Sequence, residues 1–332
     1  MNILNKINQA KLVGRGGACF PTGKKLEMVK KAQGKIKYVV CNGAEGEPGI
    51  LKDGYILENF STEVFKGMCL AMDFIKTKKA YLYLNYKYYK KFGKKLQKEI
   101  DKIKNFDIEI FQKPIHAGYI AGEESAMLKT IEKKRIEPTL KPPFPTTNGL
   151  FNCPTLINNV ETFYNISLVA DDKYENKRFY TINGDCLNTG VYFLPDSWSI
   201  KKILQETKNY QNDFSFFVQI GGDASGSIYS NKELNKKVDG AGSITVYSEK
   251  KHKSKDLIKK WLKFFLKSSC GQCTPCREGL YRLTEIIDSK KPDWKLFDDL
   301  LNNLDETSFC GLGCAVSTPI KTYFKSVGIA KK

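Results

Sequence analysis

Half of the ten cysteines lie in the C-terminal part of this 332-residue chain, and four of them follow a distinctive spacing. Cys270, Cys273 and Cys276 form a C-x2-C-x2-C pattern, and Cys310 follows in Ser308-Phe-Cys310. One turn of chain can bring three such thiols to three corners of a cubane iron–sulfur cluster, and a remote thiol can bind the fourth. Cys314 is a second candidate for the remote thiol. The pattern predicts that the C-terminal segment folds around one [4Fe–4S] cluster.

Composition indicates a globular protein that keeps its thiols reduced. Apolar residues make up 41% and charged residues 27% of the chain. There is no run of about eighteen apolar residues, and the N-terminus lacks the apolar core of a signal peptide. Nothing therefore favours export or disulfide formation. We expect a cytoplasmic protein without direct membrane insertion, so that any membrane association would come through a complex.

The formal net charge of +18 comes mainly from lysine. A nucleic-acid surface would explain this charge, but the lysines are spread through nearly every segment and no groove-reading motif is present. Solvated helix faces explain the excess better. Docking to an acidic redox partner is a secondary explanation, and we expect no nucleic-acid partner.

Strand-like and helix-like segments alternate through the first half of the chain. The pattern predicts, in order, a strand at 37–41, a helix at 63–75, a strand at 80–84, a helix at 88–103 and a strand at 107–111. This β-α-β succession is typical of an α/β domain with a largely parallel sheet. A proline-rich loop at 140–145 then interrupts regular structure.

The second half has a different pattern. Four strand-like segments and one helix lie between residues 178 and 248, which indicates a small β-rich domain of β-grasp type. After a charged linker, further helices are predicted at 257–267, 277–287, 294–304 and 318–326. We expect these helices to form a small bundle with the cluster cysteines on its connecting turns.

Two glycine-rich segments in the first half suit a bound anion or nucleotide. In residues 14–25, consecutive glycines expose N–H groups and a helix is predicted to start at Thr22. A structural glycine turn would explain this segment nearly as well. Residues 42–49 follow a strand, and ligands of α/β sheets bind beyond the carboxyl ends of the strands. The carboxylates of Glu45 and Glu47 suit hydrogen bonds to ribose hydroxyls or to a flavin ring.

Three further segments carry weaker signals. Residues 118–126 place acidic side chains at the start of a helix, which is ordinary capping chemistry when taken alone. Residues 158–162 again open a helix with polar groups. In the proline-rich loop, Lys141 and Phe144 supply either a fixed cation and a stacking face for a nucleotide or merely a rigid linker.

Taken together, these segments resemble the flavin- and NADH-binding subunit of respiratory complex I and the related diaphorase subunits of NAD-linked hydrogenases and formate dehydrogenases. Six motifs in family order carry the resemblance, at 14–23, 42–49 with Lys52-Asp53, 122–124, 140–145, 158–162 and 269–279. The resemblance covers almost the whole chain. It implies a Rossmann-like α/β domain for FMN and NADH at 1–175, a β-grasp (ubiquitin-like, SLBB-type) domain at 176–250 and a helical [4Fe–4S] domain at 251–332.

The resemblance also implies roles for individual residues. FMN and NADH would be bound by Gly14, Arg15, Gly16, Gly17, Phe20, Lys25, Asn42, Glu45, Glu47, Tyr119, Gly122, Glu123, Glu124, Lys141, Phe144, Asn158, Asn159 and Thr162. Glu45 and Glu47 would be the catalytic carboxylates, acting through binding and electrostatics rather than as proton donors. The cluster would be bound by Cys270, Cys273, Cys276 and Cys310, since Cys310 stands in the matching Ser-Phe-Cys. A carboxylate such as Glu124 near the adenosine ribose would favour NADH over NADPH.

The implied function is that of an NADH dehydrogenase (diaphorase) subunit. A hydride would pass from NADH to FMN, and single electrons would leave through the cluster to a partner, or flow in reverse. The implied partners are a thioredoxin-like [2Fe–2S] subunit, a larger ferredoxin-like subunit or a hydrogenase subunit.

Two alternatives to this function remain. A non-catalytic electron relay or scaffold that has lost flavin or NADH binding would explain three departures from the family. These are Ala44 in place of the usual acid, Met28 in place of an aromatic residue, and the short stretch before the glycine loop. The form of residues 42–48 is also similar to the flavin subunit of Rnf-type ferredoxin:NAD reductases.

Overall fold

The structure, a computed structural model, describes residues 2–328. Within this range the chain forms two compact units. The first unit comprises the chain up to Gly46 together with Leu51–Phe179, and the second comprises Glu47–Ile50 and the chain from Tyr180 onward. The short segment Glu47–Ile50, which follows the first strand in sequence, therefore belongs to the second unit.

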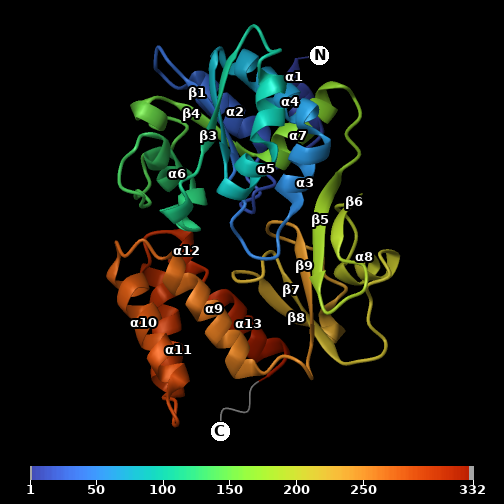
Figure 1. Ribbon diagram of the computed structural model, residues 1–332, viewed down its shortest axis with the longest axis vertical. Coiled ribbons are helices and arrows are strands. Elements are labelled where there is room, and N and C mark those ends of the chain that lie inside the picture. Colours follow the sequence, from blue (N-terminus) through green and yellow to red (C-terminus); the bar gives the residue numbers. More distant parts are fainter. Residues whose placement is uncertain (1, 329–332) are drawn as a thin grey trace. The chain divides into compact units, whose positions relative to one another are not determined.

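A parallel sheet of four strands forms the centre of the first unit (Figure 1). Its strands are β1 (Tyr38–Gly43), β2 (Lys79–Leu84), β3 (Asp107–Gln112) and β4 (Thr155–Asn159), in the order β3-β2-β1-β4. Asn42 of β1 is in register with Tyr83 of β2 and with Asn159 of β4. Because the strands are parallel, their carboxyl ends meet at one edge, where α/β sheets bind ligands.

Helices cover the faces of this sheet. They are α1 (Ile3–Gln9), α2 (Thr22–Lys31), α3 (Lys52–Asn59), α4 (Ser61–Ile75), α5 (Tyr86–Ile100), α6 (Glu124–Ile131) and α7 (Val160–Ala170). Helices α4 and α7 pack closely against each other and against β1. A Cβ atom at Gly67 would lie 1.9 Å from the carbonyl oxygen of Phe163, so only glycine allows this close approach of the two helices.

The sheet of the second unit is mixed. Its strands are β5 (Lys177–Gly184), β6 (Gly190–Pro195), β7 (Phe216–Ile220), β8 (Ser227–Ser230) and β9 (Ser243–Ser248), in the order β6-β5-β9-β7-β8. Strand β9 pairs in parallel with β5 and antiparallel with β7. The single helix α8 (Ile200–Glu206) buries Ile200, Ile203 and Leu204 in the apolar core of this sheet.

The second unit ends in a group of helices. They are α9 (Ser254–Ser268), α10 (Thr274–Asp288), α11 (Trp294–Thr307), α12 (Gly311–Cys314) and α13 (Ser317–Ser326). Helix α10 packs against both α9 and α11, and α13 packs against β8. The backbone N–H of Ile228 in β8 donates to the Thr322 hydroxyl of α13 at 2.9 Å, which joins the helices to the sheet.

The expected α/β fold with a parallel sheet and a helical C-terminal region is confirmed. Strands β4 and β8 and helices α1 and α3 had not been expected. Strand β4 ends in Asn158 and Asn159, and the helix start expected there is also correct, because Asn159 is the N-cap of α7 and its side chain accepts from the N–H of Glu161. In residues 2–328, no helix combines the length and apolar character needed to cross a membrane.

Candidate functional site

The first glycine-rich segment forms a loop whose two ends are joined by backbone contacts. Val13 and Pro21 make an antiparallel bridge, and the N–H of Gly14 donates to the carbonyl oxygen of Phe20 at 2.9 Å. Gly17 has φ +111°, a conformation that side chains with a Cβ rarely adopt. The loop leads directly into α2, whose N-cap Pro21 makes no side-chain capping bond. The exposed Gly16 and the half-buried Gly17 leave the backbone of the loop accessible next to this helix.

This loop is fixed to the start of α7. The N–H of Arg15 donates to the hydroxyl of Thr162 at 2.9 Å, and a Cβ at Gly16 would lie 3.3 Å from the Cβ of Asn159. The guanidinium of Arg15 is buried and reaches the Tyr174 hydroxyl at 3.2 Å. Thr162 and the Arg15 side chain therefore hold the loop in place, and the glycines leave its backbone accessible.

The loop after β1 meets the segment before α6. The side-chain amide of Asn42 donates to the carbonyl oxygen of Gly122 at 2.9 Å and accepts from the N–H of Ala44 at 3.1 Å. A Cβ at Gly122 would lie 3.4 Å from the Ala44 methyl group. Ala44 is 3% exposed and packs in an apolar cluster with Tyr83 and other buried residues. In this chain, position 44 is therefore a packing position.

We call the space at the carboxyl edge of the parallel sheet the crevice. Asn158, near the end of β4, provides a test of whether this crevice fits a flavin. The side chain is 6% exposed, and its Nδ2 donor has no hydrogen-bond partner among residues 2–328. A buried amide donor without a protein acceptor is destabilising, and a bound ligand with an acceptor oxygen would remove this cost. FMN carries acceptor oxygens on its ring, ribityl chain and phosphate. The residues present fit this cofactor.

Glu45, one of the two predicted catalytic carboxylates, accepts hydrogen bonds from other groups of the protein. Its carboxylate accepts from the N–H groups of Asp53 at 2.9 Å and Gly54 at 3.3 Å, and the phenol of Tyr88 donates to it as well. Burial, and then the charge of Asp53, raise the pKa of Glu45 to about 7. The ring of Tyr88 requires a glycine at position 54, since a Cβ there would lie 2.5 Å from Tyr88 Cζ.

A buried ion network lies beside Glu45. Lys52 is 1% exposed, and its ammonium contacts Asp53 at 2.7 Å, Glu161 at 3.2 Å and the Asn159 amide oxygen at 2.9 Å. Burial lowers the pKa of Lys52, but the charges of Asp53 and Glu161 outweigh this effect and raise it. The Nδ2 of Asn159 donates to Asp53 at 2.7 Å. Glu161 stands in the 158–162 motif and Tyr88 in none, and in neither case does the local sequence predict these partners.

The charged residues predicted to contact NADH form a second group in the first unit. The ammonium of Lys141 lies 3.0 Å from the Glu123 carboxylate and also bonds to Glu124. Lys25 lies 3.9 Å from Glu124 and donates to the carbonyl oxygen of Ile157 at 2.8 Å. Burial lowers the pKa of Lys25. Glu123 additionally caps α6 by accepting from the N–H groups at its start, so its sequence interpretation as a helix cap is correct.

The aromatic residues predicted to stack on a nucleotide are accessible. Phe20 is 39% and Phe144 is 50% exposed. Tyr119 lies against the loop after β1, because a Cβ at Gly46 would come within 3.3 Å of its ring. Exposed aromatic faces of this size favour stacking of a flat ligand.

Glu47, the other predicted catalytic carboxylate, lies in the second unit and is 8% exposed. Its Oε1 accepts from the N–H groups of Ala224 at 3.0 Å and Ser225 at 2.9 Å. A Cβ at Gly222, where φ is +148°, would lie 2.3 Å from this oxygen, so glycine makes room for the carboxylate. Successive N–H groups in a turn form a concave anion site, and Glu47 occupies it.

The cluster cysteines meet at the starts of two helices. Cys273 is the N-cap of α10, Cys276 lies in the first turn of that helix, and Cys310 is the N-cap of α12. A Cβ at Gly313 of α12 would lie 3.5 Å from the Cβ of Cys276. Burial raises the pKa of Cys276 to about 11, and the charges of Cys273, Cys310 and Cys270 contribute to the increase. All four predicted thiols are therefore close enough to interact.

The four predicted thiols form a donor set of the kind that binds a cubane cluster. Residues 2–328 contain no group of three or more His, Cys, Asp or Glu side chains arranged to hold one metal ion. In a cubane each thiolate binds a different iron, so the thiols stand farther apart than the ligands of one ion. Cys314 lies with its thiol 3.9 Å from the Ser308 carbonyl oxygen, and its pKa is raised by burial.

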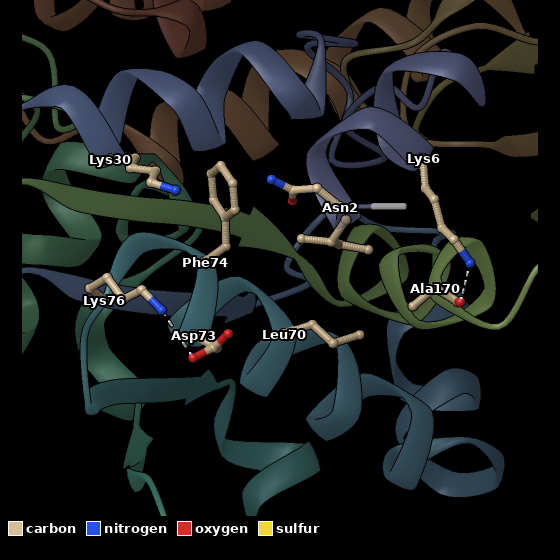
Figure 2. Close-up of a pocket in the computed structure, with 9 residues that line it drawn as sticks. Asn2, Lys6, Lys30, Leu70, Asp73, Phe74, Lys76 and Ala170 are labelled. Carbon is tan, nitrogen blue, oxygen red and sulfur yellow. Dashed lines mark hydrogen bonds and ion pairs between the residues drawn. The ribbon is translucent and has the colours of Figure 1, made fainter.

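A separate hollow of about 440 Å³ lies away from all of these residues in the first unit (Figure 2). Its lysines already have partners. Lys6 donates to the carbonyl oxygen of Ala170 at 2.9 Å, Lys30 lies over the ring of Phe74 at 4.1 Å, and Lys76 faces the carboxylate of Asp73. The hollow includes none of the residues predicted to bind a cofactor.

Comparison with known proteins agrees with this geometry. Residues 7–168 match the model of the Nuo51 FMN-binding domain, and residues 256–327 match that of the NADH-ubiquinone oxidoreductase-F iron-sulfur binding region. The F subunit of the NADH-quinone oxidoreductase of Aquifex aeolicus is 30% identical over 96% of this chain and 82% of its own length. The chain belongs to this family of NADH-quinone oxidoreductase F subunits. Members carry FMN and a [4Fe–4S] cluster and depend on NADH, and the predicted cofactors are confirmed at this level.

The family extends to hydrogenases. The alpha subunit of the NAD-reducing hydrogenase HoxS of Cupriavidus necator is 30% identical over 96% of this chain, which spans 58% of that subunit. A crystal structure of an NAD+-reducing [NiFe]-hydrogenase in the H2-reduced state superposes with a TM-score of 0.91 at 26% identity. The match covers 98% of this chain and 61% of the solved chain. The resemblance found from the sequence motifs is therefore confirmed.

Proposed function

We propose that this protein is an NADH dehydrogenase (diaphorase) subunit, in which a hydride passes between NADH and FMN and single electrons pass through one [4Fe–4S] cluster to or from a partner. The observation that carries the proposal is the meeting of three loops at the carboxyl edge of the parallel sheet, beside the partnerless amide of Asn158. FMN supplies the step that converts a two-electron donor into a one-electron donor.

The residues proposed to hold FMN act mainly through backbone and amide groups. Gly14 closes the loop through its bond to Phe20, and the N–H groups of Gly16 and Gly17 would donate to a phosphate near the start of α2. Asn158 would donate to a cofactor oxygen, while Asn42 and Asn159 keep the surrounding loops in place through the bonds to Gly122 and Asp53.

NADH is proposed to bind at the more exposed part of the same unit. Phe20 and Phe144 offer aromatic faces, and Lys25 and Lys141 offer positive charge to its phosphates. Glu124 lies between these lysines and would face an adenosine ribose, so that a 2′-phosphate is disfavoured. We therefore propose NADH rather than NADPH as the substrate.

Glu45 and Glu47 are proposed to act without transferring protons. Each carboxylate already accepts hydrogen bonds from backbone N–H groups. Both residues thus fix the course of the chain around Gly46 and set the local electrostatic field. Hydride transfer requires orientation of the two rings rather than a proton donor, so this arrangement suits the reaction.

The proposal also includes the ligands of the cluster and the two domains of the second half of the chain. We propose Cys270, Cys273, Cys276 and Cys310 as the cluster ligands, a β-grasp (SLBB-type) domain at 176–250 and a helical domain at 251–332. Relatives are subunits of larger assemblies, which supports a thioredoxin-like [2Fe–2S], ferredoxin-like or hydrogenase subunit as the partner. We propose the cytoplasm as the compartment, because thiol ligands require reducing conditions.

The test is to purify the protein anaerobically and to record flavin absorbance before and after adding NADH. We expect bound flavin to be bleached by NADH. The matched variant Cys276→Ser should keep this bleaching while losing the cluster's electron paramagnetic resonance signal. Bound flavin that NADH does not bleach would refute the enzyme and support the non-catalytic relay.

A further inference from the structure

Lys113 is a buried lysine that none of the assignments above uses. It directly follows β3, and its N–H donates to the carbonyl oxygen of Leu84 at 2.8 Å, which extends the pairing of β3 with β2. Its side chain is 8% exposed. The residue therefore lies at the carboxyl edge of the parallel sheet, the edge at which α/β proteins bind ligands.

The ammonium group of Lys113 has no compensating partner. In the part of the chain that the structure describes, no hydrogen bond or ion pair engages its Nζ. Burial lowers the pKa of Lys113 to about 8, and no neighbouring charge contributes to this change. A lysine buried without a counter-charge is destabilising, because its charge loses hydration without gaining a partner. Such groups are found preferentially at functional sites.

The surroundings of this ammonium group belong to the proposed FMN crevice. A Cβ at Gly46 would lie 3.8 Å from the Nζ of Lys113 and 3.3 Å from the ring of Tyr119. Gly46 is exposed, so the space beside the ammonium opens toward solvent. The amine, the loop after β1 and the segment before α6 therefore border one space.

We propose that Lys113 binds FMN through its ammonium group, at an anionic edge of the cofactor. This inference rests on the proposed function. Two parts of FMN share the required chemistry, namely the phosphate and the N1–O2 edge of the isoalloxazine ring, which becomes anionic on reduction. A resident cofactor is favoured over NADH because Lys113 is buried, whereas the residues proposed for NADH include the exposed Phe20 and Phe144.

The experiment compares the wild-type protein with Lys113→Met after removal of FMN. Binding of FMN and of riboflavin is measured at pH 7 by quenching of flavin fluorescence. A charged hydrogen bond of typical strength predicts at least about a tenfold weaker affinity in the variant. An equal loss for FMN and riboflavin identifies the ring edge, and a loss for FMN alone identifies the phosphate. For the ring edge, the flavin midpoint potential also falls in the variant.

Three further measurements separate binding from a structural role. The FMN-free variant should melt at the same or a higher temperature than the FMN-free wild type, since it no longer buries a lone charge. Wild-type affinity should fall as the pH rises through about 8, and this dependence should vanish in Lys113→Met. Lys113→Arg should retain affinity. Lys98→Met, which removes an exposed lysine on α5, is the matched control and should change nothing.

Unchanged flavin affinity and potential in Lys113→Met would overturn the inference, as would a variant that melts at a clearly lower temperature without FMN. If the variant does not fold, a wild-type affinity that is flat between pH 7 and 9 overturns it instead. A wild-type protein that binds no flavin at all contradicts the proposed function itself, so the two failures are distinguishable.

Discussion

Two buried lysines in the first unit have opposite electrostatic surroundings. Lys52 is surrounded by Asp53, Glu161 and the Asn159 amide, and its pKa is raised. Among residues 2–328, Lys113 has no such neighbours, and its pKa is lowered to about 8. Both side chains are at least nine-tenths buried. The difference indicates that the region around Lys52 is complete within the protein, whereas the region around Lys113 requires something from outside.

At the carboxyl edge of the parallel sheet, the Lys52 region stabilises the fold, whereas the Lys113 region is available to bind a ligand. The Lys52 network joins α3 to the start of α7 behind the loop that contains Glu45. It pairs the buried acidic residues Asp53 and Glu161 with Lys52. The Lys113 region offers one uncompensated charge beside Gly46. Uncompensated polar groups, rather than acidic motifs, therefore indicate where a cofactor fits.

The largest effect is expected for Lys52→Met. Removing this cation leaves Asp53 and Glu161 as buried carboxylates without a counter-charge, which typically costs about 3–5 kcal/mol of unfolding free energy. Urea unfolding followed by circular dichroism measures the loss. A loss below about 1 kcal/mol would show that the network contributes little and would remove the contrast with Lys113.

The opposite sign is expected for Lys113→Met in the FMN-free protein. At pH 7 the variant should be more stable by about 1–3 kcal/mol, because the wild type buries a charge. The unfolded wild type binds this proton up to about pH 10.5, and the folded form only up to about 8. Wild-type stability should therefore rise relative to the variant between these pH values, as urea unfolding across that range would measure. A constant difference would contradict this reading of Lys113.

A smaller effect is expected for Glu45→Gln. The pKa of Glu45 is raised from 4.5 to about 7, so the folded protein holds this proton more tightly than the unfolded chain. The stability of the wild type relative to the variant should consequently fall by up to about 3 kcal/mol as the pH rises from 4.5 to 7. Thermal melts at intervals across this range provide the test. Parallel curves would mean that Glu45 has the same pKa in the folded and the unfolded protein.

The smallest effect is expected for Lys91→Met, which serves as the baseline. Lys91 pairs with Glu58 at 3.0 Å, but both side chains are largely exposed. Such pairs contribute about 0–1 kcal/mol and weaken in salt. Urea unfolding at low and high salt should therefore give nearly the same value as for the wild type. A loss comparable to that of Lys52→Met would show that burial does not explain the difference between the two sites.

Much of the fold could be predicted because local patterns specify it. The alternation that predicted β1, β2 and β3 depends on short apolar runs, and the helices near the cluster depend on apolar residues at helical spacing. Strand β4 was missed because its final residues, Asn158 and Asn159, are polar. Because these two residues are polar, they do not continue the apolar pattern from which a strand is predicted.

The candidate site was predicted less completely than the fold. The glycine loop and Asn42 lie beside the segments that the motifs suggested. The carboxylates of Glu45 and Glu47 resemble each other in sequence, yet one is held by the start of α3 and Tyr88 and the other by the turn at Ala224 and Ser225. No spacing rule predicts partners that are so distant in the chain.

The sequence by itself determined the family and the cofactors, because cysteine spacing and glycine loops are local features that chemistry constrains directly. It also predicts which four thiols bind the cluster. Only the tertiary structure decided which charged residues are satisfied within the protein. Burial and pairing depend on segments far apart in the chain, as for Lys52 beside Glu161. For the same reason Lys113 could not be told from the many other lysines of this basic chain until its surroundings were known.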